Sequence, residues 1–459
     1  MEGFWDYSVW GTFNLIAILL LSLLAANVVK RSVPMLRASL IPTSVLGGSM
    51  LIVVAAVYKL FTGNTMFDEP FFGGNGTATL EVLTYHTLAL GFIASTFKTS
   101  KGKLTKKRAR EIFNTGVTTV STYLLQGMVG LVVTIAAAWI VPGFFSAAGI
   151  LLPFGYGQGT GQALNYGGIF ENDFGFAGGK SFGLTIAALG FLSASIGGVF
   201  HLFIIKRRGK IVSGTVRAKK IRSEEIQTDN EIPMQESMDK MTVQVALVTV
   251  AYLLAYLFMY LLGCALPGMR SVIYGFNFIL GVLAASVVKL ILKLFKKYGF
   301  GTREYVNDFL MTRASNFFYD LMVVAGIAAI RLGVLKDYWG IILIMGLLGA
   351  VITYMYNYFI AYRLFPDYAE EQFLTMYGML TGTASTGVIL LREIDSDFST
   401  PASDNMVYQN FPAIVFGFPL MLLATMAPLQ PGLTLLILTA FFSVLNVILF
   451  WPGAKKRNH

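Results

Sequence analysis

The chain has 459 residues, of which 55% are hydrophobic and only 13% are charged. A soluble protein carries roughly 25% charged residues, so this composition excludes a soluble domain and indicates that lipid is the main solvent. The formal charge of +10 does not indicate nucleic acid, because Lys and Arg fall in short loops between apolar runs. The single cysteine, Cys264, excludes an intramolecular disulfide.

Eleven apolar runs are long enough to cross roughly 30 Å of hydrocarbon as helices. They lie near residues 8–29, 43–61, 80–97, 112–141, 181–205, 241–264, 271–293, 313–332, 338–364, 405–427 and 432–450. Two further segments, about 145–170 and about 372–391, are apolar but are interrupted by glycines and hydroxyl residues. We expect each of them to be a re-entrant hairpin, which enters and leaves the membrane at one face.

The distribution of Lys and Arg favours this topology. With two hairpins and the N-terminus outside, 30 of the 35 Lys and Arg residues lie on the cytoplasmic side. If 145–170 crossed the membrane completely, the nine basic residues of the loop 206–240 would move outside, against the positive-inside rule. The sequence therefore predicts a multi-pass protein of a cytoplasmic (inner) membrane, with its N-terminus outside and its C-terminus in the cytoplasm.

An internal repeat accompanies the two hairpins. At an offset of 223 residues, Leu151, Gly155, Gly159 and Thr160 match Leu374, Gly378, Gly382 and Thr383. Because the first half begins outside and the second begins inside, we expect an all-α fold of two inverted five-helix repeats. The expected parts are residues 1–205 as the first repeat, 206–240 as a cytoplasmic linker, 241–430 as the second repeat, and 431–459 as an extra transmembrane helix with a basic tail.

Broken helices inside a membrane indicate a binding site, because irregular backbone at that depth must line a cavity or be buried in protein. Helix N-termini attract a carboxylate, and freed carbonyl and hydroxyl oxygens suit Na⁺. The alternative is that the small residues only let helices pack closely. The substrate-binding candidates are Gln158, Gly159, Thr160, Gly161, Gln162, Thr381, Gly382, Thr383, Ser385 and Thr386.

Other polar residues extend this set. Asn316 and Asp320 lie within an apolar run, where an ionisable group is a functional candidate, although Asp320 could instead pair with a neighbouring Lys or Arg. We take both as cation-binding candidates, with Gly157 and Gly378. Arg392 could bind a second substrate carboxylate. With three histidines, no P-loop and no metal-ligand spacing, the sequence indicates neither an enzyme nor an ATP-driven pump.

Several motifs resemble the bacterial sodium/glutamate symporter family. They are the Pro42-to-Gly48 run that opens the second helix, Gly157-Gln158-Gly159-Thr160-Gly161, the glycine-rich run from Gly190 to Gly198, and Asn316 early in its helix. The resemblance covers the chain to about residue 430, and it implies a homodimer and elevator-type, Na⁺-coupled uptake of glutamate, with no other cofactor. Two departures from the family pattern fall in the hairpins. Gln158 replaces a common histidine, and residues 382–386 lack the family's proline.

We therefore expect a secondary transporter that carries Na⁺ and glutamate, or a similar small carboxylate-bearing amino acid, into the cell. One alternative is a 2-hydroxycarboxylate or dicarboxylate carrier or a Na⁺/H⁺ antiporter on a similar fold. Another, from a different class, is a membrane sensor or assembly protein that transports nothing.

Overall fold

A computed structural model describes residues 3–98, 105–208, 231–234, 238–299, 303–395 and 400–454. These ranges are almost entirely helical, and their single β-bridge joins Glu231 to Glu304. Most of the expected linker 206–240 and the basic tail from Lys455 lie outside the described residues.

The first half of the chain forms the following helices: α1 (Tyr7–Ser32), α2 (Pro34–Ala38), α3 (Thr43–Thr62), η1 (Met66–Asp68), η2 (Pro70–Phe72), α4 (Gly76–Phe97), α5 (Lys106–Ile140), η3 (Ser146–Ile150), α6 (Leu151–Tyr156), α7 (Thr160–Phe174) and α8 (Gly179–Arg207). The second half forms α10 (Lys240–Ala265), η4 (Pro267–Met269), α11 (Arg270–Gly275), α12 (Asn277–Lys297), α13 (Asp308–Ala328), η5 (Leu332–Leu335), α14 (Trp339–Leu364), η6 (Pro366–Tyr368), α15 (Ala369–Thr381), α16 (Ala384–Arg392), α17 (Ala402–Tyr408), α18 (Asn410–Met426) and α19 (Pro431–Ala454).

Each of the eleven expected crossings corresponds to a helix or a pair of helices. Within the described residues, nine helices are long and apolar enough to span a membrane. The expected crossing at 405–427 is a bent pair, with α17 and the following helix inclined at 52°. The expected crossing at 313–332 corresponds to α13, which contains Arg313, Asn316 and Asp320 and is not among these nine helices. The chain is therefore an all-α, multi-pass membrane protein.

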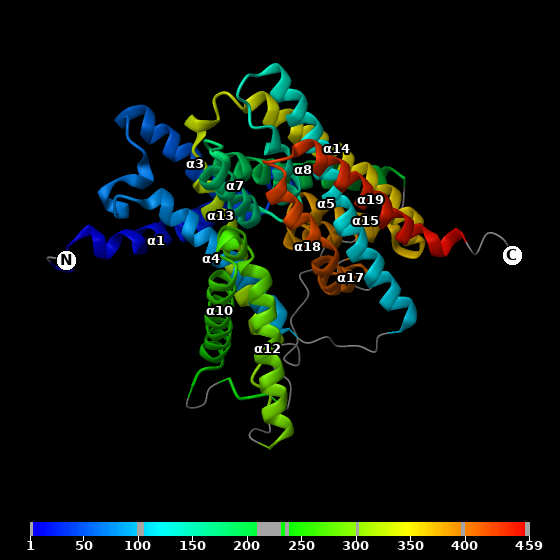
Figure 1. Ribbon diagram of the computed structural model, residues 1–459. Helices are drawn as coiled ribbons and strands as arrows, with labels where there is room; N and C mark the ends of the chain where they lie inside the picture. Colours follow the sequence, from blue (N-terminus) through cyan, green and yellow to red (C-terminus); the bar gives the residue numbers. More distant parts are fainter. Residues whose placement is uncertain are drawn as a thin grey trace. The chain divides into compact units, whose positions relative to one another are not determined.

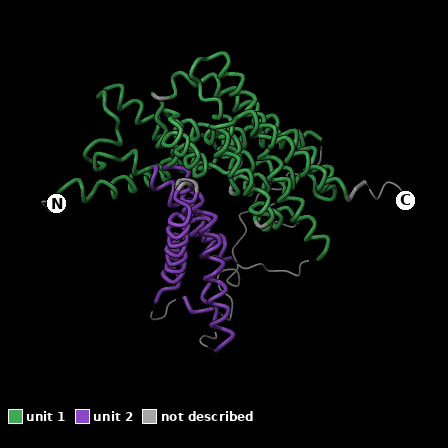
Figure 2. Tube along the Cα trace, in the orientation of Figure 1, with its two compact units in different colours: residues 1–80, 104–217, 326–459 green, residues 81–103, 218–325 purple. Residues whose placement is uncertain are grey.

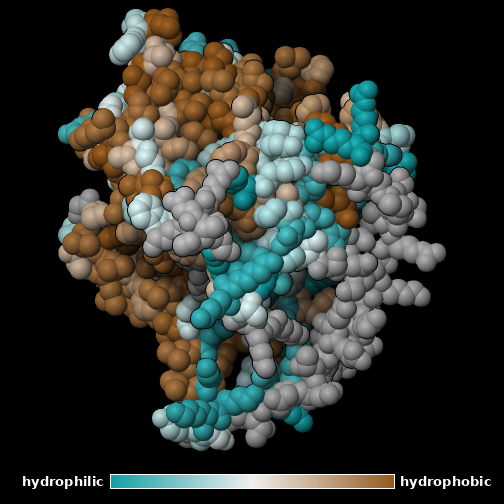
Figure 3. All heavy atoms as spheres, turned by 90° about the vertical axis from the view of Figure 1, so that its right-hand side faces the viewer, coloured by the Kyte–Doolittle hydropathy of each residue, from teal (hydrophilic) through white to brown (hydrophobic). Residues whose placement is uncertain are grey.

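The chain divides into two compact units, and each contains segments from both halves of the sequence (Figures 1 and 2). Unit 1 comprises residues 1–80, 104–217 and 326–459, and unit 2 comprises residues 81–103 and 218–325. Large apolar side chains such as Leu60, Leu347 and Leu436 are exposed, and brown apolar residues cover much of the face drawn in Figure 3. Soluble proteins rarely expose such extensive apolar surface, whereas lipid accommodates it.

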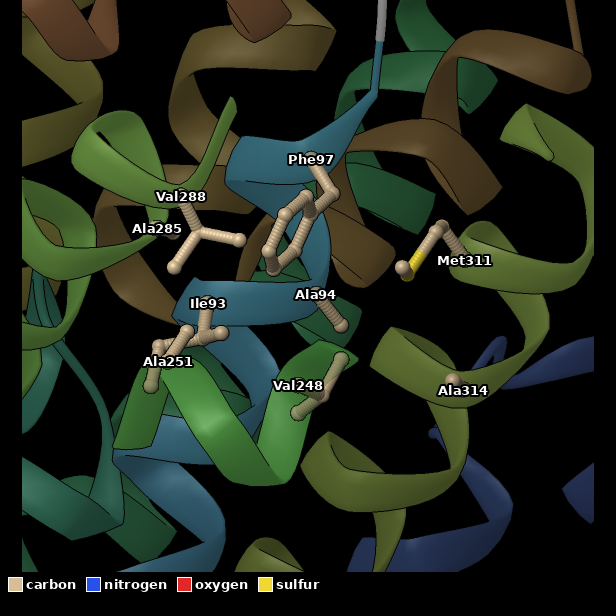
Figure 4. Packing of buried hydrophobic residues seen from close by; sticks show 9 residues of the cluster. All are labelled: Ile93, Ala94, Phe97, Val248, Ala251, Ala285, Val288, Met311 and Ala314. Atoms are coloured by element: carbon tan, nitrogen blue, oxygen red, sulfur yellow. The ribbon is translucent and has the colours of Figure 1, made fainter. Parts of the chain in front are cut away.

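The core of unit 2 combines small and large side chains from four helices (Figure 4). Alanines on α4, α10, α12 and α13 let the helices approach closely, which is how membrane helices gain packing energy without a hydrophobic driving force. Ile93, Phe97, Val248 and Met311 fill the remaining space, and each is at least 99% buried.

A buried ion pair anchors the start of α10 within unit 2. Lys240 Nζ lies 2.7 Å from Glu231 Oε2, and only 1% and 8% of the two side chains is exposed. Asn307 donates a second hydrogen bond, of 2.6 Å, to the same carboxylate oxygen. Because the charges are shielded from water, each depends on the other for stabilisation.

Replacing Lys240 by methionine should remove the cation that lies 2.7 Å from the buried Glu231 carboxylate. We expect the free energy of unfolding to fall by about 3–5 kcal/mol, measured by denaturant unfolding of the purified protein in mixed micelles. The matched control is Lys296→Met, because the Lys296–Glu304 pair is 3.0 Å long but about half exposed and should change stability by no more than ~1 kcal/mol. Equal effects of the two substitutions would contradict the anchoring role.

Candidate functional site

The first expected hairpin, 145–170, is a broken helix in unit 1. α6 ends at Tyr156, and α7 begins at Thr160 with Gly159 as its N-cap. Gly159 has φ of 82° and ψ of −171°, a conformation that is essentially restricted to glycine. The two arms pack together, because the rings of Phe154 and Tyr166 are stacked with their centroids 3.9 Å apart.

The second expected hairpin, 372–391, is a broken helix of the same kind. α15 ends at Thr381, and α16 begins at Ala384 after a break at Gly382 and Thr383. The arms cross at two glycines, since a Cβ placed on Gly378 would lie 2.8 Å from the Cα of Gly387. The two breaks also fall at positions that the 223-residue offset pairs, whereas the inverted relation of the halves and the re-entry into the membrane stay predictions.

The tips of the two broken helices meet inside unit 1. A Cβ placed on Gly159 would lie 3.6 Å from Thr383 Cγ2 and 3.9 Å from the carbonyl oxygen of Gly382. Residues more than 220 positions apart in the sequence are thereby brought together at the two breaks.

Helix α5 holds both breaks from one side. Tyr123 Oη donates a 3.1 Å hydrogen bond to the carbonyl of Gly157, at the end of α6. One turn further along α5, Gln126 Nε2 donates a 2.9 Å hydrogen bond to the carbonyl of Leu380, near the end of α15. Carbonyls at helix C-termini have no hydrogen-bond donor within the helix. Tyr123 and Gln126 each supply a donor to one such carbonyl, so each hairpin has one of these carbonyls satisfied.

Helix α8 also packs against both hairpins, and one of its glycines, Gly190, lies close to both breaks. A Cβ placed on Gly190 would lie 2.4 Å from the carbonyl oxygen of Thr381 and 3.2 Å from the Cα of Tyr156. Both neighbours are backbone atoms, which cannot rotate away as a side chain can, so only glycine allows α8 to approach the two breaks this closely.

The electrostatics of the tips come from helix ends. The first helical hydrogen bond of α7 runs from Ala163 N to Gly159 O, and that of α16 runs from Gly387 N to Thr383 O. Amides that precede these bonds, such as those of Gly161 and Gln162, take no part in the helix ladder. Two positive helix ends therefore converge, which favours an anion such as a carboxylate.

The Gln162 side chain adds a polar group without a partner. It is 1% exposed, and neither its Oε1 nor its Nε2 has a hydrogen-bond partner among the described residues. Each buried polar group that makes no hydrogen bond lowers the free energy of unfolding by about 1–3 kcal/mol. A ligand that both donates and accepts hydrogen bonds, as an amino acid does, would remove this cost.

The remaining candidates occupy different places. Thr160, Thr381 and Thr386 are fully or almost fully buried beside the breaks, whereas the Ser385 side chain lies outside the description. Arg392 is exposed at the far end of α16, roughly 12 Å along the axis from the first residue of that helix. Asn316 and Asp320 are exposed on the part of α13 that belongs to unit 2, and their role in cation binding stays a prediction.

The residues on α5 and α8 that contact the breaks were not among the sequence candidates. The signal for Gln126 was a lone amide in an apolar run, which is equally typical of an ordinary interhelical hydrogen bond. Tyr123 carried no distinguishing signal, because tyrosines are common in membrane helices. Gly190 was marked only as the first residue of the glycine-rich run that ends at Gly198.

The fold and the site together define a polytopic α-helical membrane protein with two broken helices that meet within unit 1. A comparison with protein-family models gives no match to this chain. A comparison with curated proteins likewise gives no match.

The close approach at Gly190 predicts a steric effect. We expect Gly190→Ala to lower the free energy of unfolding by about 1–3 kcal/mol, because its Cβ overlaps the backbone of α15. The control is Gly340→Ala on α14, where a Cβ would meet nothing within 4 Å and where the helix should gain up to ~1 kcal/mol. Thermal unfolding of the two purified variants measures the difference, and equal stability would refute the tight packing.

The re-entrant topology predicts which ends of the hairpins share a membrane face. In a Cys264→Ser background, an impermeant maleimide should label Ser146→Cys and Asn172→Cys, at the two ends of the first hairpin, in intact cells. Asp367→Cys and Glu393→Cys, at the ends of the second hairpin, should react only after the membrane is permeabilised. If the two ends of either hairpin react from opposite sides, that segment crosses the membrane and the topology is wrong.

Proposed function

We propose that this protein is a secondary active transporter that carries Na⁺ and glutamate, or a similar small carboxylate-bearing amino acid, into the cell. The observation that carries the proposal is the meeting of two broken helices at Gly159 and Thr383, with positive helix ends and the unpartnered Gln162 amide beside the contact. Broken helices that meet in the interior of a membrane protein are the usual construction of transporter binding sites.

The site is suited to an anionic, hydrogen-bonding solute. A carboxylate would accept hydrogen bonds from the backbone amides at the starts of α7 and α16, where the helix dipoles favour negative charge. The Gln162 amide would bond an amino or a second carboxyl group, and the hydroxyls of Thr383 and Thr386, which lie 3.4 Å apart, would complete the contacts. The choice of glutamate comes from the family resemblance.

Coupling to Na⁺ and an elevator movement complete the proposal. Carbonyl groups at the ends of α6 and α15 present negative helix ends to the same region, which favours a cation. In the proposal, unit 1, which carries both hairpins, and unit 2 are the two bodies that move relative to each other. A homodimer in a bacterial inner membrane is part of the proposal and rests on the resemblance alone.

Uptake into proteoliposomes tests the function directly. Labelled glutamate should accumulate when an inward Na⁺ gradient is imposed, and it should not when K⁺ replaces Na⁺ or when the liposomes lack protein. Absence of gradient-dependent uptake of glutamate and of every other amino or dicarboxylic acid would refute the proposal. A Na⁺-dependent pH change without organic solute would support an antiporter instead.

The role of Gln162 can be separated from its role in packing. We expect Gln162→Leu to raise the glutamate concentration for half-maximal uptake by roughly 10-fold or more, because a buried hydrogen bond to the solute is lost. The control is Gln372→Leu on α15, since Gln372 is fully buried but bonds Thr115 and Asn405. That variant should lose stability and keep the wild-type concentration dependence; equal shifts in both variants would contradict the assignment.

A further inference from the structure

A histidine is buried where α8 packs against α14 and α15, and the proposed transport of Na⁺ and glutamate does not use it. His201 on α8 is 1% exposed. Its Nε2 lies 2.9 Å from Glu370 Oε2 on α15, and its Nδ1 lies 2.7 Å from Tyr354 Oη on α14. All three helices belong to unit 1. Both ring nitrogens therefore have a polar partner, and the two partners come from different helices.

The His201–Glu370 pair is able to hold or release one proton without losing a hydrogen bond. An ionised carboxylate only accepts hydrogen bonds, so a neutral His201 donates its Nε2–H to Glu370. The bare Nδ1 then accepts from the hydroxyl of Tyr354. When a proton is added at Nδ1, the same hydroxyl oxygen accepts instead, because a phenol can act in either direction. Proton binding therefore requires no movement of the heavy atoms.

The charge of the pair favours an added proton. Only 13% of the Glu370 side chain is exposed, and a largely buried carboxylate that faces a neutral ring keeps an uncompensated negative charge. A proton on His201 makes the pair neutral. The His201 ring centroid is also 4.2 Å from that of Phe373 and 5.7 Å from that of Tyr354, and aromatic rings within about 6 Å attract a cation. Histidine is the side chain that ordinarily changes its charge near neutral pH.

Further titratable groups face the pair. Tyr362 Oη donates to the other carboxylate oxygen, Glu370 Oε1, and the ring centroid of Tyr358 lies 5.9 Å from that of His201. Arg208, at the end of α8, hydrogen-bonds Tyr358 and interacts with the charge of Glu370. Arg208 is exposed, so water weakens the effect of its charge. The carboxylate in direct contact with the ring is therefore the dominant charge at His201.

The pair lies at one end of a line of contacts between α8 and α15. Further along, Tyr377 Oη donates a 3.0 Å hydrogen bond to the carbonyl of Ser193. The line ends at the second break, where a Cβ on Gly190 would lie 2.4 Å from the carbonyl oxygen of Thr381. A stronger attachment at the pair would hold in place the helix that ends at this break, and a pre-organised site binds its ligand more tightly.

We propose that His201 and Glu370 bind one proton between them, and that this proton tightens α15 against α8 and thereby strengthens solute binding at the second break. The ligand is a proton, which the proposed Na⁺-coupled uptake does not include. Proton binding does not require transport, whereas the link to the solute rests on the proposed function. Because such links are reciprocal, glutamate would strengthen proton binding by the same factor.

Histidine NMR measures proton binding directly. The chain has three histidines, so in the histidine-labelled full-length protein the His201 signal is identified by its absence from His201→Gln. This signal should show the uptake of one proton within the range from about pH 5 to 9. In Glu370→Gln the proton affinity of His201 should fall by about 10-fold or more, because an opposite charge within hydrogen-bond distance is lost. A ring that keeps one protonation state over the whole range in the wild type would overturn the proposal.

Two controls separate the pair from general effects of charge. Glu371→Gln removes the same charge from the same first turn of α15, and it should change the proton affinity of His201 far less than Glu370→Gln does. His86 on α4 also bonds a tyrosine, with its Nδ1 2.7 Å from Tyr252 Oη, and its signal should not respond to Glu370→Gln. Equal effects of the two glutamate substitutions on His201 would overturn the proposal.

A double-mutant cycle tests whether the proton tightens the contact between α8 and α15. Thermal unfolding is measured for the wild type, His201→Gln, Glu370→Gln and the double variant at about pH 6 and at about pH 8, on the two sides of neutrality. The coupling between the two residues should be larger at the lower pH, because the carboxylate then bonds a charged ring. Equal coupling at both pH values is expected of a purely structural hydrogen bond and would overturn the proposal.

The pH dependence of solute binding tests the link. With equal pH on both sides of the membrane, the glutamate concentration for half-maximal uptake should rise by at least about 5-fold between the lower and the higher pH, which is the lower end of typical coupling between sites. His201→Gln should remove this dependence and His86→Gln should keep it. A wild type without pH dependence, or a dependence of the same size in His201→Gln, would refute the link.

The fates of the two proposals are distinguishable. Na⁺-driven uptake, together with a His201 signal that shows no proton uptake, would refute the proton site and leave the transport function standing. Proton uptake by His201 with pH-dependent coupling to Glu370, but without uptake of any solute, would support the proton site and refute the transport function.

Discussion

The structure depends on one constraint, which is that backbone N–H and C=O groups cannot remain unpaired in an apolar medium. An unbroken helix satisfies them internally, but α6–α7 and α15–α16 interrupt the ladder where the two tips meet. The chain compensates with Tyr123 and Gln126, which donate to carbonyls at the two breaks, and with the close approach of Gly190. The polar groups that remain, including the Gln162 amide, are those available to a ligand.

The same constraint connects the solute and the ion. The two arms of a broken helix present opposite partial charges at one point, because one arm ends there and the other begins. An anionic solute would bind near the starts of α7 and α16, and a cation near the end of α15. Each ligand would reduce the repulsion between the other ligand and the helix end whose partial charge has the same sign. In the proposed mechanism, the protein moves readily when both the solute and the cation are bound. Movement is unfavourable when only one of them is bound, because its charge is then not balanced.

The two compact units differ in how they are held together. Unit 2 relies on close packing of alanines and large apolar residues on four helices, and on one buried ion pair beside the start of α10. At the hairpins of unit 1, hydroxyl and amide side chains of α5, α14 and α15 are buried and bonded to one another. A network of directional bonds permits few arrangements, which suits a site whose geometry must be exact to within a fraction of an ångström.

The sequence by itself determined the membrane class, the apolar helical segments and the positions of both breaks, because hydropathy and glycine content are local properties of the chain. It could not determine that Gly159 and Thr383 touch, or that His201 and Glu370 meet, since these pairs are more than 200 residues apart or lie on faces that only packing defines. It also suggested Asn316 and Asp320 as cation ligands, and this stays a prediction. Which polar groups pair with one another and which are left for a ligand is decided by tertiary packing, because hydrogen bonding depends on distances of a few ångströms that no local pattern records.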